Sequence, residues 1–411
     1  MNPSRKKRTP PGERTVPHRG RPRTLAYYLP QFHAIPENDA WWGEGFTEWT
    51  NVRRAEAQFE GHDQPRVPKG LGYYSLTDPS AVMTSQAKSA KESGVDGFCF
   101  YAYWFDGQRL LEGPLDWYQS KGPDFPFCVS WANESWTRRW DGKDHEVLMP
   151  QTYAEGFAAE LFADFLPYFQ HPSYVRVGDK PVFVVHRVDQ IPNAESVARE
   201  WQSLAIQAGL TGLHLVAAET KWGIDPTSYG FDAVAEFPPV GSNTLASAWR
   251  APLKQVGQNF TGRLLSYKRL SQRFMHRRAS EFVRYRGVAP GWDNTARRST
   301  NATIYVGSNP ETYRRWLSHA RRSEQLDRGE EGLVFINAWN EWAEGAYLEP
   351  DSTWGDEYAL ATRWEAVATA SDRRPVPHGR WDRPQLRSLA QLALGSVLSV
   401  LRIVRAKMIR L

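Results

Sequence analysis

The sequence predicts an α/β protein, namely a TIM-like (β/α)8 barrel with long loops at the C-terminal face of its strands. Three observations predict this fold. Short apolar runs alternate with helical patterns between residue 24 and about residue 371, and eight such runs can be counted. The loops that follow the runs are longer and richer in Trp, Asn, Glu and His than the loops that precede them. The alternation also fits a doubly wound sheet, but eight strands and this loop asymmetry favour the barrel.

The eight predicted strands are short and rich in β-branched and aromatic residues. The sixth and the seventh are the weakest, because Pro238 follows one and Pro290 interrupts the other. In chain order the runs are Leu25–Leu29, Gly97–Tyr101, Phe127–Trp131, Val182–His186, Leu213–Ala217, Ala233–Phe237, Gly287–Gly291 and Leu333–Asn337.

Five helices are predicted between these strands from apolar residues at helical spacing and from start and stop residues such as Pro79 and Gly94. They cover residues 78–94, 153–169, 193–208, 310–326 and 357–370.

The composition is that of a protein with a sizeable core, since 41% of the residues are hydrophobic and 24% are charged. The net charge of +5 comes from the two ends. Residues 1–23 carry eight Lys and Arg against one Glu, and residues 387–411 carry five basic residues and no acidic one, so the remainder is acidic. The central domain therefore gives no argument for binding nucleic acid.

The two ends are predicted to be separate from the barrel, which covers residues 24–371. Residues 1–23 have the charge of a signal peptide but no apolar stretch, so we expect a flexible basic tail and a cytoplasmic protein. Residues 372–388 read as a linker, and residues 389–411 as a basic amphipathic helix that is too short to span a bilayer. This helix either lies peripherally on the anionic inner face of the cytoplasmic membrane or docks on the barrel.

Cysteine and histidine usage predicts neither a disulfide framework nor a metal site. Cys99 and Cys128 both lie in apolar runs, which predicts buried free thiols in a reducing compartment. The ten His residues show no metal-ligand spacing. We therefore expect no metal and no cofactor, and nothing in the sequence specifies an oligomeric state.

The segment that carries most chemistry is the end of the eighth predicted strand, where Asn340-Glu341-Trp342-Ala343-Glu344-Gly345 follows an apolar run. Side chains three residues apart in a helical turn lie about 5 to 6 Å apart, so both carboxylates can face one small substrate. Two carboxylates at this separation repel, and one is expected to keep its proton at neutral pH. A general acid beside a general base is what cleavage of a glycosidic bond requires. The alternative is a structural ion-pair network, which a lone Glu-x-x-Glu pattern also fits.

Longer motifs resemble a known family. Residues 340–345 followed by Glu349-Pro350 are similar to the acidic signature of glycoside hydrolase family 99, whose members cleave internal α-mannoside linkages. Residues 27–33 (YYLPQFH), 41–49 (WWGEGFTEW) and 131–134 (WANE) resemble the WbsX group. That group shares the family 99 type of barrel and is associated with bacterial O-antigen and other surface polysaccharide synthesis. The resemblance covers about residues 24–370.

By this resemblance, Glu341 is the base that removes a proton from the sugar 2-hydroxyl, and Glu344 is the acid that protonates the leaving oxygen. The sugar then attacks its own anomeric carbon through an anhydro intermediate, with retention of configuration. Members of the WbsX group are commonly labelled glycosyltransferases, so the resemblance leaves the sugar and the direction of reaction open.

Other polar and aromatic residues at predicted strand ends are candidates for binding an oligosaccharide or polysaccharide. Each polar one can instead be a hydrogen-bonded structural residue, and each Trp can instead be packed beneath a loop. The candidates are Tyr28, Gln31, His33, Trp42, Glu48, Trp49, Tyr103, Trp104, Trp131, Asn133, Glu134, Trp136, His186, Glu219, Glu236, Trp292, Asp293, Trp339, Asn340 and Trp342.

Three functions compete on the sequence. A retaining glycosidase or transglycosidase comes first, and a glycosyltransferase that uses an activated sugar donor comes second. The second is weakened because the sequence has no Asp-x-Asp pair for a divalent metal and no glycine-rich phosphate loop. A non-catalytic glycan-binding protein is the third, since it needs the aromatic residues but not the acid pair.

Overall fold

The computed structural model describes residues 20–138 and 143–364. Most of the predicted basic tail, the linker at 372–388 and the helix at 389–411 lie outside the described residues. No helix within the described ranges is both long and apolar enough to cross a membrane.

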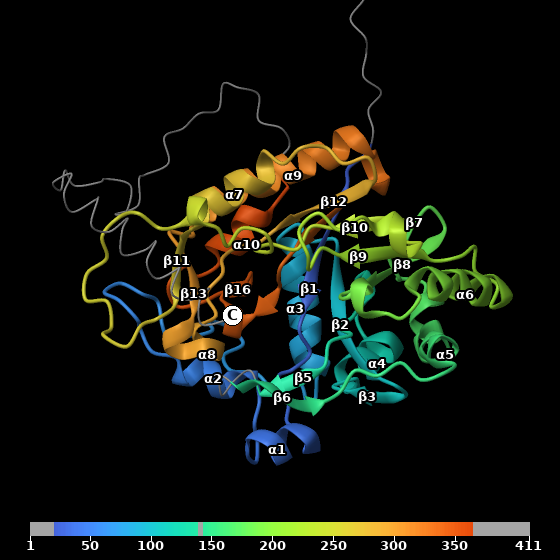
Figure 1. Cartoon of the computed structure of the whole chain (residues 1–411), viewed down its shortest axis with the longest axis horizontal. Coiled ribbons are helices and arrows are strands. Elements are labelled where there is room, and N and C mark those ends of the chain that lie inside the picture. The colour runs from blue at the N-terminus through green and yellow to red at the C-terminus, as the bar shows by residue number, and fades with distance from the viewer. Residues whose placement is uncertain (1–19, 139–142, 365–411) are drawn as a thin grey trace, which may run out of the picture.

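The described chain forms a closed barrel of eight parallel strands, which confirms the predicted fold (Figure 1). Each strand pairs with its neighbour, and β1 closes the barrel by pairing with both β14 and β2. The strands, in the order of the barrel, are β1 (Arg23–Tyr28), β2 (Gly97–Phe105), β4 (Phe127–Trp131), β8 (Lys180–Val185), β9 (His214–Ala218), β10 (Ala233–Ala235), β12 (Val283–Val288) and β14 (Leu333–Ile336).

Aromatic side chains fill the interior of the barrel. Tyr27 of β1 stacks on Tyr101 of β2 with ring centroids 5.5 Å apart, and it contacts Phe335 and Phe237 at 5.7 and 5.3 Å. Phe237 follows β10, which is three strands away from β1 around the wall, so this contact crosses the interior. Cys99 and Cys128 are free and buried in adjacent strands, as predicted.

Helices surround this barrel and account for the apolar outer face of the strands (Figure 1). Between β9 and β10 the chain forms only the short turn η3 (Pro226–Tyr229). The outer helices are α3 (Ser80–Glu92), α4 (Gly113–Lys121), α5 (Phe157–Phe169), α6 (Ala194–Gln207), α7 (Tyr267–Met275), α9 (Pro310–Asp327) and α10 (Glu357–Thr362).

Four predicted elements have a wrong boundary. The second strand continues to Phe105 rather than ending at Tyr101. The seventh strand lies at Val283–Val288 rather than 287–291, because charged side chains on its outer face obscure the apolar pattern. The helix expected from residue 153 begins at Phe157. The last helix ends at Thr362, well before residue 370. There Arg321 donates a hydrogen bond of 2.7 Å to the carbonyl oxygen of Thr362, and Arg363 is no longer helical.

Smaller elements occupy the loops, most of them beyond the C-terminal ends of the strands. A second, small apolar cluster lies beside the β11–β13 pair and contains Phe59, Phe260 and Leu264. These elements are α1 (Pro36–Trp42), α2 (Glu48–Arg54), α8 (Thr295–Arg298), β3 (Gln108–Leu110), β5 (Trp136–Arg138), β6 (Lys143–Met149), β7 (Arg176–Val177), β11 (Arg263–Ser266), β13 (Thr303–Val306), β15 (Asn340–Glu341), β16 (Ala346–Tyr347) and the 3-10 turns η2 (Val188–Gln190), η4 (Leu245–Ser247), η5 (Ser299–Asn301), η6 (Gly329–Glu331) and η7 (Trp342–Glu344).

Candidate active site

The two predicted catalytic carboxylates lie in a tight hairpin just after β14. Glu341 ends β15 and Glu344 ends the turn η7, after which Gly345 leads into β16. Gly345 has a φ of +59°, and a Cβ at this position would come within 3.0 Å of the Asp293 side chain. Glycine therefore fits both the turn and the close approach of the neighbouring loop.

Arg297 of α8 holds three carboxylates together. Its Nη2 donates hydrogen bonds to Glu341 Oε1 at 2.7 Å and to Glu48 Oε1 at 3.2 Å. Its Nη1 donates to Glu344 Oε1 at 3.1 Å. Glu341 and Glu344 thus converge on neighbouring nitrogens of one guanidinium, and Glu48 of α2 joins them from the other end of the chain.

The electrostatics of this cluster are set by three acids around one base. Burial raises the pKa of Glu341 well above its usual range; Arg297 opposes this shift, while Glu344 and Glu48 add to it. Burial would lower the pKa of Arg297, but the three carboxylates raise it well above its ordinary value. Arg297 therefore stays protonated, and Glu341 retains a proton more readily than an ordinary carboxyl group.

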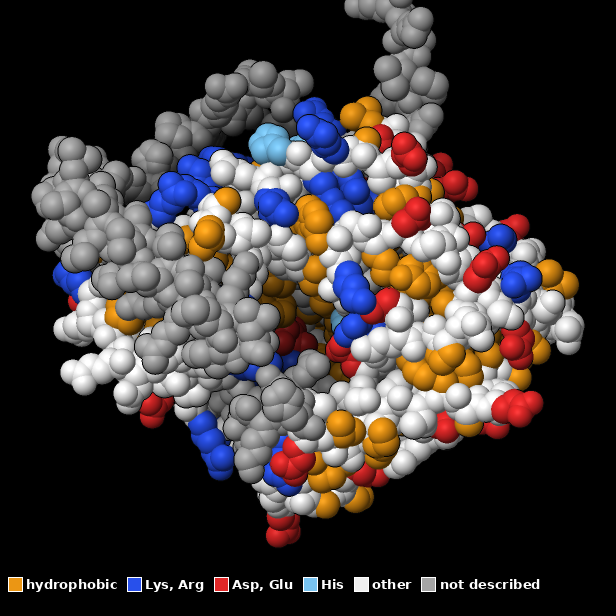
Figure 2. All heavy atoms as spheres, in the orientation of Figure 1, with side chains coloured by type: hydrophobic (Ala, Val, Ile, Leu, Met, Phe, Trp, Pro, Cys, Tyr) orange, Lys and Arg blue, Asp and Glu red, His pale blue; other side chains and the backbone are white. Residues whose placement is uncertain are grey.

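These residues lie in a cavity of about 350 Å³ at the C-terminal ends of the strands. This volume is in the range that holds small ligands. In Figure 2 the surface is hollowed near the centre of the view, with acidic and basic side chains at the hollow. Ten of the predicted site residues line the cavity: Gln31, Trp42, Glu48, Tyr103, Glu134, Trp136, His186, Trp292, Glu341 and Glu344.

One wall of the cavity is aromatic. Trp136 of β5 packs edge-on against Tyr103 at 5.1 Å and against Trp41 of α1 at 5.9 Å. The Tyr103 hydroxyl accepts a hydrogen bond of 2.6 Å from Gln31 Nε2. Flat rings and an amide at the same wall suit the apolar faces and hydroxyls of sugar rings.

Another part of the cavity wall is polar. Glu134 lies 3.8 Å from His186 Nε2 and 2.5 Å from an Arg187 nitrogen. Asn133 does not line the cavity but positions this wall, because its side chain both accepts from the Arg187 backbone nitrogen at 2.7 Å and donates to the Arg187 carbonyl oxygen at 2.9 Å.

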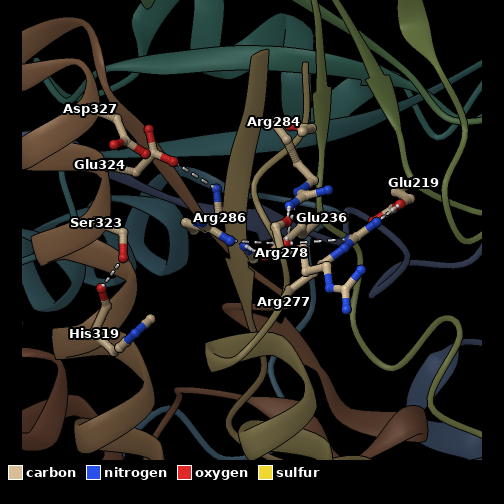
Figure 3. A network of polar contacts seen from close by, with 12 residues as sticks. Glu219, Glu236, Arg277, Arg278, Arg284, Arg286, His319, Ser323, Glu324 and Asp327 are labelled. Carbon is tan, nitrogen blue, oxygen red and sulfur yellow. Dashed lines mark hydrogen bonds and ion pairs between the residues drawn. The ribbon is translucent and has the colours of Figure 1, made fainter. Parts of the chain in front are cut away.

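Glu219 and Glu236 do not line the cavity, although both follow strand ends (Figure 3). Tyr285 packs on Phe335 on the inner side of the wall, so its neighbours Arg284 and Arg286 point outward. Glu236 contacts both at 3.3 and 3.6 Å, and Arg277 contacts Glu219 and Glu236. The two carboxylates therefore belong to an ion-pair network outside the barrel.

Asp293 does not line the cavity, but it anchors the loop that carries Arg297. Its carboxylate contacts His62 at 2.8 Å, Gln64 at 2.7 Å and Arg66 at 3.3 Å. Although burial acts in the opposite sense, His62, Arg66 and Thr295 hold the pKa of Asp293 well below its usual range. Its backbone nitrogen donates to the Glu344 carbonyl oxygen at 2.6 Å, which joins the two loops of the site.

The remaining predicted residues lie outside the cavity lining. Asn340 ties the β14 loop to the β1 loop, because its amide accepts from the Leu29 nitrogen at 2.7 Å and donates to the Leu29 oxygen at 3.0 Å. Most of the others are buried among aromatic residues or hydrogen-bonded to structural partners. They are Tyr28, His33, Trp49, Trp104, Trp131, Trp339 and Trp342.

Arg297 is the site residue that sequence reasoning missed. Its position in the sequence could have indicated it, because it follows Trp292-Asp293 a few residues beyond the seventh strand, where the loops that form the site begin. Other lining residues not predicted are Leu29, Asn38, Trp41, Phe46, Tyr101, Ala132, Ser135, Thr137, Leu148, Phe237, Asn294 and Arg298. Within the described residues, no group of three or more His, Cys, Asp or Glu is arranged to hold a metal ion.

A (β/α)8 barrel with carboxylates and aromatic rings at the C-terminal ends of its strands is an arrangement of the carbohydrate-active class. The family model described as "Glycosyltransferase WbsX" matches residues 24–362. The chain therefore belongs to the WbsX family.

The chain is also similar to curated relatives and to solved structures. Two strains of Xanthomonas campestris pv. campestris contain an "Uncharacterized protein WxcX" that is 44% identical over 354 residues, which is 85% of this chain and 50% of the relative. The chain thus spans about half the length of these relatives. A solved "Glycoside hydrolase-like protein" has a TM-score of 0.52 at 14% identity, covering 87% of this chain and 96% of that chain, which supports the fold. An endo-alpha-mannosidase from Bacteroides thetaiotaomicron has a TM-score of 0.49 at 16% identity, covering 82% and 95%.

Proposed function

We propose that this chain is a glycan-processing enzyme that cleaves or transfers a glycosidic bond with retention of configuration. The observation that carries the proposal is the convergence of Glu341, Glu344 and Glu48 on Arg297 in an aromatic-walled cavity. General acid and base catalysis needs two carboxyl groups that differ in proton affinity at one substrate. Glu341 and Glu344 lie in different surroundings, because their side chains are buried to different extents.

Glu341 is proposed as the base. It is the more buried of the two, with 7% of its side chain exposed against 20% for Glu344. Burial and the neighbouring carboxylates raise the pKa of Glu341, and a carboxylate of higher pKa is a stronger base toward a sugar hydroxyl. Arg297 limits this shift and so favours the ionised form that accepts the proton.

Glu344 is proposed as the acid, because it is the more exposed and the departing part of the glycan leaves toward solvent. Glu341 takes the proton of the 2-hydroxyl, the O2 atom bonds to C1, and the bond from C1 to the leaving oxygen breaks as Glu344 protonates that oxygen. Glu344 then takes a proton from water or from an acceptor hydroxyl, which attacks C1. The bond between C1 and O2 breaks, and O2 recovers its proton from Glu341.

The charge of the cavity favours a neutral glycan over a nucleotide sugar. Four carboxylates line it, from Glu48, Glu134, Glu341 and Glu344, against Arg297 and Arg298 among the described residues. A diphosphate would meet an excess of like charge, which opposes binding.

A glycosyltransferase that uses an activated sugar donor is the second candidate, because the description of the matching family favours it. The two activities are separated by incubating the purified chain either with a panel of bacterial surface oligosaccharides, including α-mannosides, or with nucleotide sugars and acceptor glycans. Cleavage of an internal linkage, with NMR showing a first product of retained anomeric configuration, supports the proposed function. Release of nucleotide without glycan cleavage would overturn it in favour of transfer from an activated donor.

The same assay is repeated with Glu341→Gln and Glu344→Gln. Each variant is expected to lose about 10²- to 10⁴-fold in turnover, because each removes one partner of the proton transfer. Glycan binding, measured by calorimetry, should persist in both. Unchanged turnover in both variants would refute the catalytic roles and leave a glycan-binding protein.

A further inference from the structure

Glu48 is a buried acid that the two catalytic roles leave unexplained. It is the first residue of α2, and its side chain is fully buried at the wall of the cavity. Its Oε1 accepts a hydrogen bond from Arg297 Nη2, the same nitrogen that donates to Glu341 Oε1. Two carboxyl groups from opposite ends of the chain therefore meet at one nitrogen.

The second oxygen of Glu48 has no conventional donor. Glu48 Oε2 is buried without a hydrogen-bond partner among the described residues. A buried acceptor that lacks a donor is costly, by about 1 to 3 kcal/mol. An ionised carboxylate can only accept hydrogen bonds, so Glu341 can supply the missing donor only if it carries a proton.

The groups that face Glu341 decide whether it keeps such a proton. They are Arg297, Glu344, Glu48 and the phenols of Tyr101 and Tyr103. Burial raises the pKa of Glu341, Arg297 lowers it, and Glu344 and Glu48 raise it, the latter also by a hydrogen bond between the two carboxyl groups. One guanidinium cannot neutralise three carboxylates, and one retained proton removes most of the excess charge.

We propose that Glu48 and Glu341 share one proton in the empty cavity, and that Glu48 takes this proton when a sugar binds. The proton moves from a Glu341 oxygen to a Glu48 oxygen, which leaves Glu341 as the anion and Glu48 as the neutral acid. Glu341 is then free to accept the proton of the sugar 2-hydroxyl. The role of Glu48 as a positioning residue rests on the proposed function, whereas the shared proton does not.

The shared proton is tested by infrared spectroscopy, without any substrate. The C=O stretch of protonated carboxyl groups is followed from pH 4 to pH 9 in the unchanged chain, Glu341→Gln and Glu48→Gln. We expect a component present at neutral pH in the unchanged chain and absent in Glu341→Gln. In Glu48→Gln the same component should titrate at lower pH, because the variant removes a neighbouring negative charge.

Glu134→Gln is the matched control. Glu134 lines the same cavity, but its carboxylate contacts Arg187 and His186 instead of Arg297. This variant should leave the titration of the Glu341 component unmoved. If Glu48→Gln does not fold, the test is the presence of the infrared component at neutral pH in the unchanged chain and its absence in Glu341→Gln. Absence of the component at neutral pH, or equal midpoints in the unchanged chain and Glu48→Gln, would overturn the proposal.

Kinetics test the transfer to Glu48 separately. If Glu48 regulates Glu341, the acidic limb of the pH profile of kcat/KM moves to lower pH in Glu48→Gln, while Glu48→Asp, which keeps a carboxyl group, restores part of the original profile. A residue that only anchors Arg297 would lower the rate without moving this limb, and that result would overturn the role of Glu48. If no glycan is turned over at all, the proposed function fails, and the infrared experiment still decides whether the proton is shared.

Discussion

Two of the clusters in which arginine meets buried glutamate, among the described residues, have opposite balances of charge. In the cavity, one guanidinium of Arg297 holds three carboxylates. In the network outside the barrel, Arg277, Arg284 and Arg286 surround the two carboxylates of Glu219 and Glu236 (Figure 3).

The neighbours of the two buried acids act in opposite senses. Burial raises the pKa of Glu341, and two further carboxylates add to this effect. Burial also raises the pKa of Glu236, but Arg286, Arg277 and Arg284 all oppose it. The arginines of the outer network therefore limit the rise in the pKa of Glu236 that burial causes, and they hold elements together, whereas the cavity keeps an excess of acid that is available for proton transfer. The position of a glutamate after a strand end does not by itself distinguish the cavity cluster from the outer network.

The largest expected effect is on stability, from Arg277→Met. This change leaves Glu219 buried without its cationic partner, and breaking a buried ion pair on one side costs about 3 to 5 kcal/mol. Urea unfolding followed by circular dichroism measures the loss. Activity per folded molecule should be retained, since Arg277 does not line the cavity. A loss of activity without loss of stability would contradict the purely structural role of the outer network.

Arg297→Met is expected to act on catalysis instead. Without the guanidinium the three carboxylates repel and lose their alignment, and a misplaced catalytic group costs about 10²-fold in rate. Because Arg297 lowers the pKa of Glu341, its removal should raise that pKa further and move the acidic limb of the rate profile to higher pH. Steady-state kinetics between pH 4 and pH 9 check both effects. A fall in stability with unchanged kinetics would make this cluster structural, like the outer one.

Most of the fold could be predicted from the sequence, because strands buried on both faces appear as apolar runs. The seventh strand was misplaced since Arg284 and Arg286 interrupt its pattern, and their partner Glu236 lies about 50 residues away, where no local rule connects them.

The site could be predicted where its residues lie close together in the sequence. Glu341 and Glu344 follow directly on an apolar strand, so their position beside the cavity could be inferred. Arg297 was missed because its contact with them depends on two loops that meet only after β12 and β14 pair in the barrel. Glu219 and Glu236 were included because a strand end does not reveal which side of the wall a side chain faces.

A smaller effect, on the pH dependence of stability, is expected from Glu324, which lies beside Arg328 and Arg286. Burial raises the pKa of Glu324 to about 7, although Arg328 opposes the shift. The folded chain therefore binds more protons than the unfolded chain between pH 4.5 and 7, so the free energy of unfolding falls as pH rises through this window. The slope from one group is at most about 1.4 kcal/mol per pH unit.

Glu324→Gln should flatten this part of the stability curve, as measured by urea unfolding at pH 5, 6, 7 and 8. Glu311→Gln is the control, because it removes a carboxyl group from the first turn of the same helix. An equal slope in the unchanged chain and Glu324→Gln would show that Glu324 does not retain its proton.

The smallest expected effect is a difference in KM between variants of two tryptophans, each of which has an arginine over its ring. Trp42 lines the cavity, with the Arg138 guanidinium 5.4 Å from its ring, whereas Trp222 lies in the outer region, 3.9 Å from that of Arg277. If Trp42 stacks on a sugar, Trp42→Ala should raise KM about 3- to 10-fold, which corresponds to the 0.5 to 1.5 kcal/mol of an aromatic contact, and leave kcat unchanged.

Trp222→Ala removes a ring that is already 37% exposed and lies outside the cavity, so KM should not change. Trp42→Phe, which keeps an aromatic face, should recover part of the lost affinity. Initial rates over a range of oligosaccharide concentrations measure all three. Equal KM values for the two Ala variants would mean that Trp42 does not stack on the substrate.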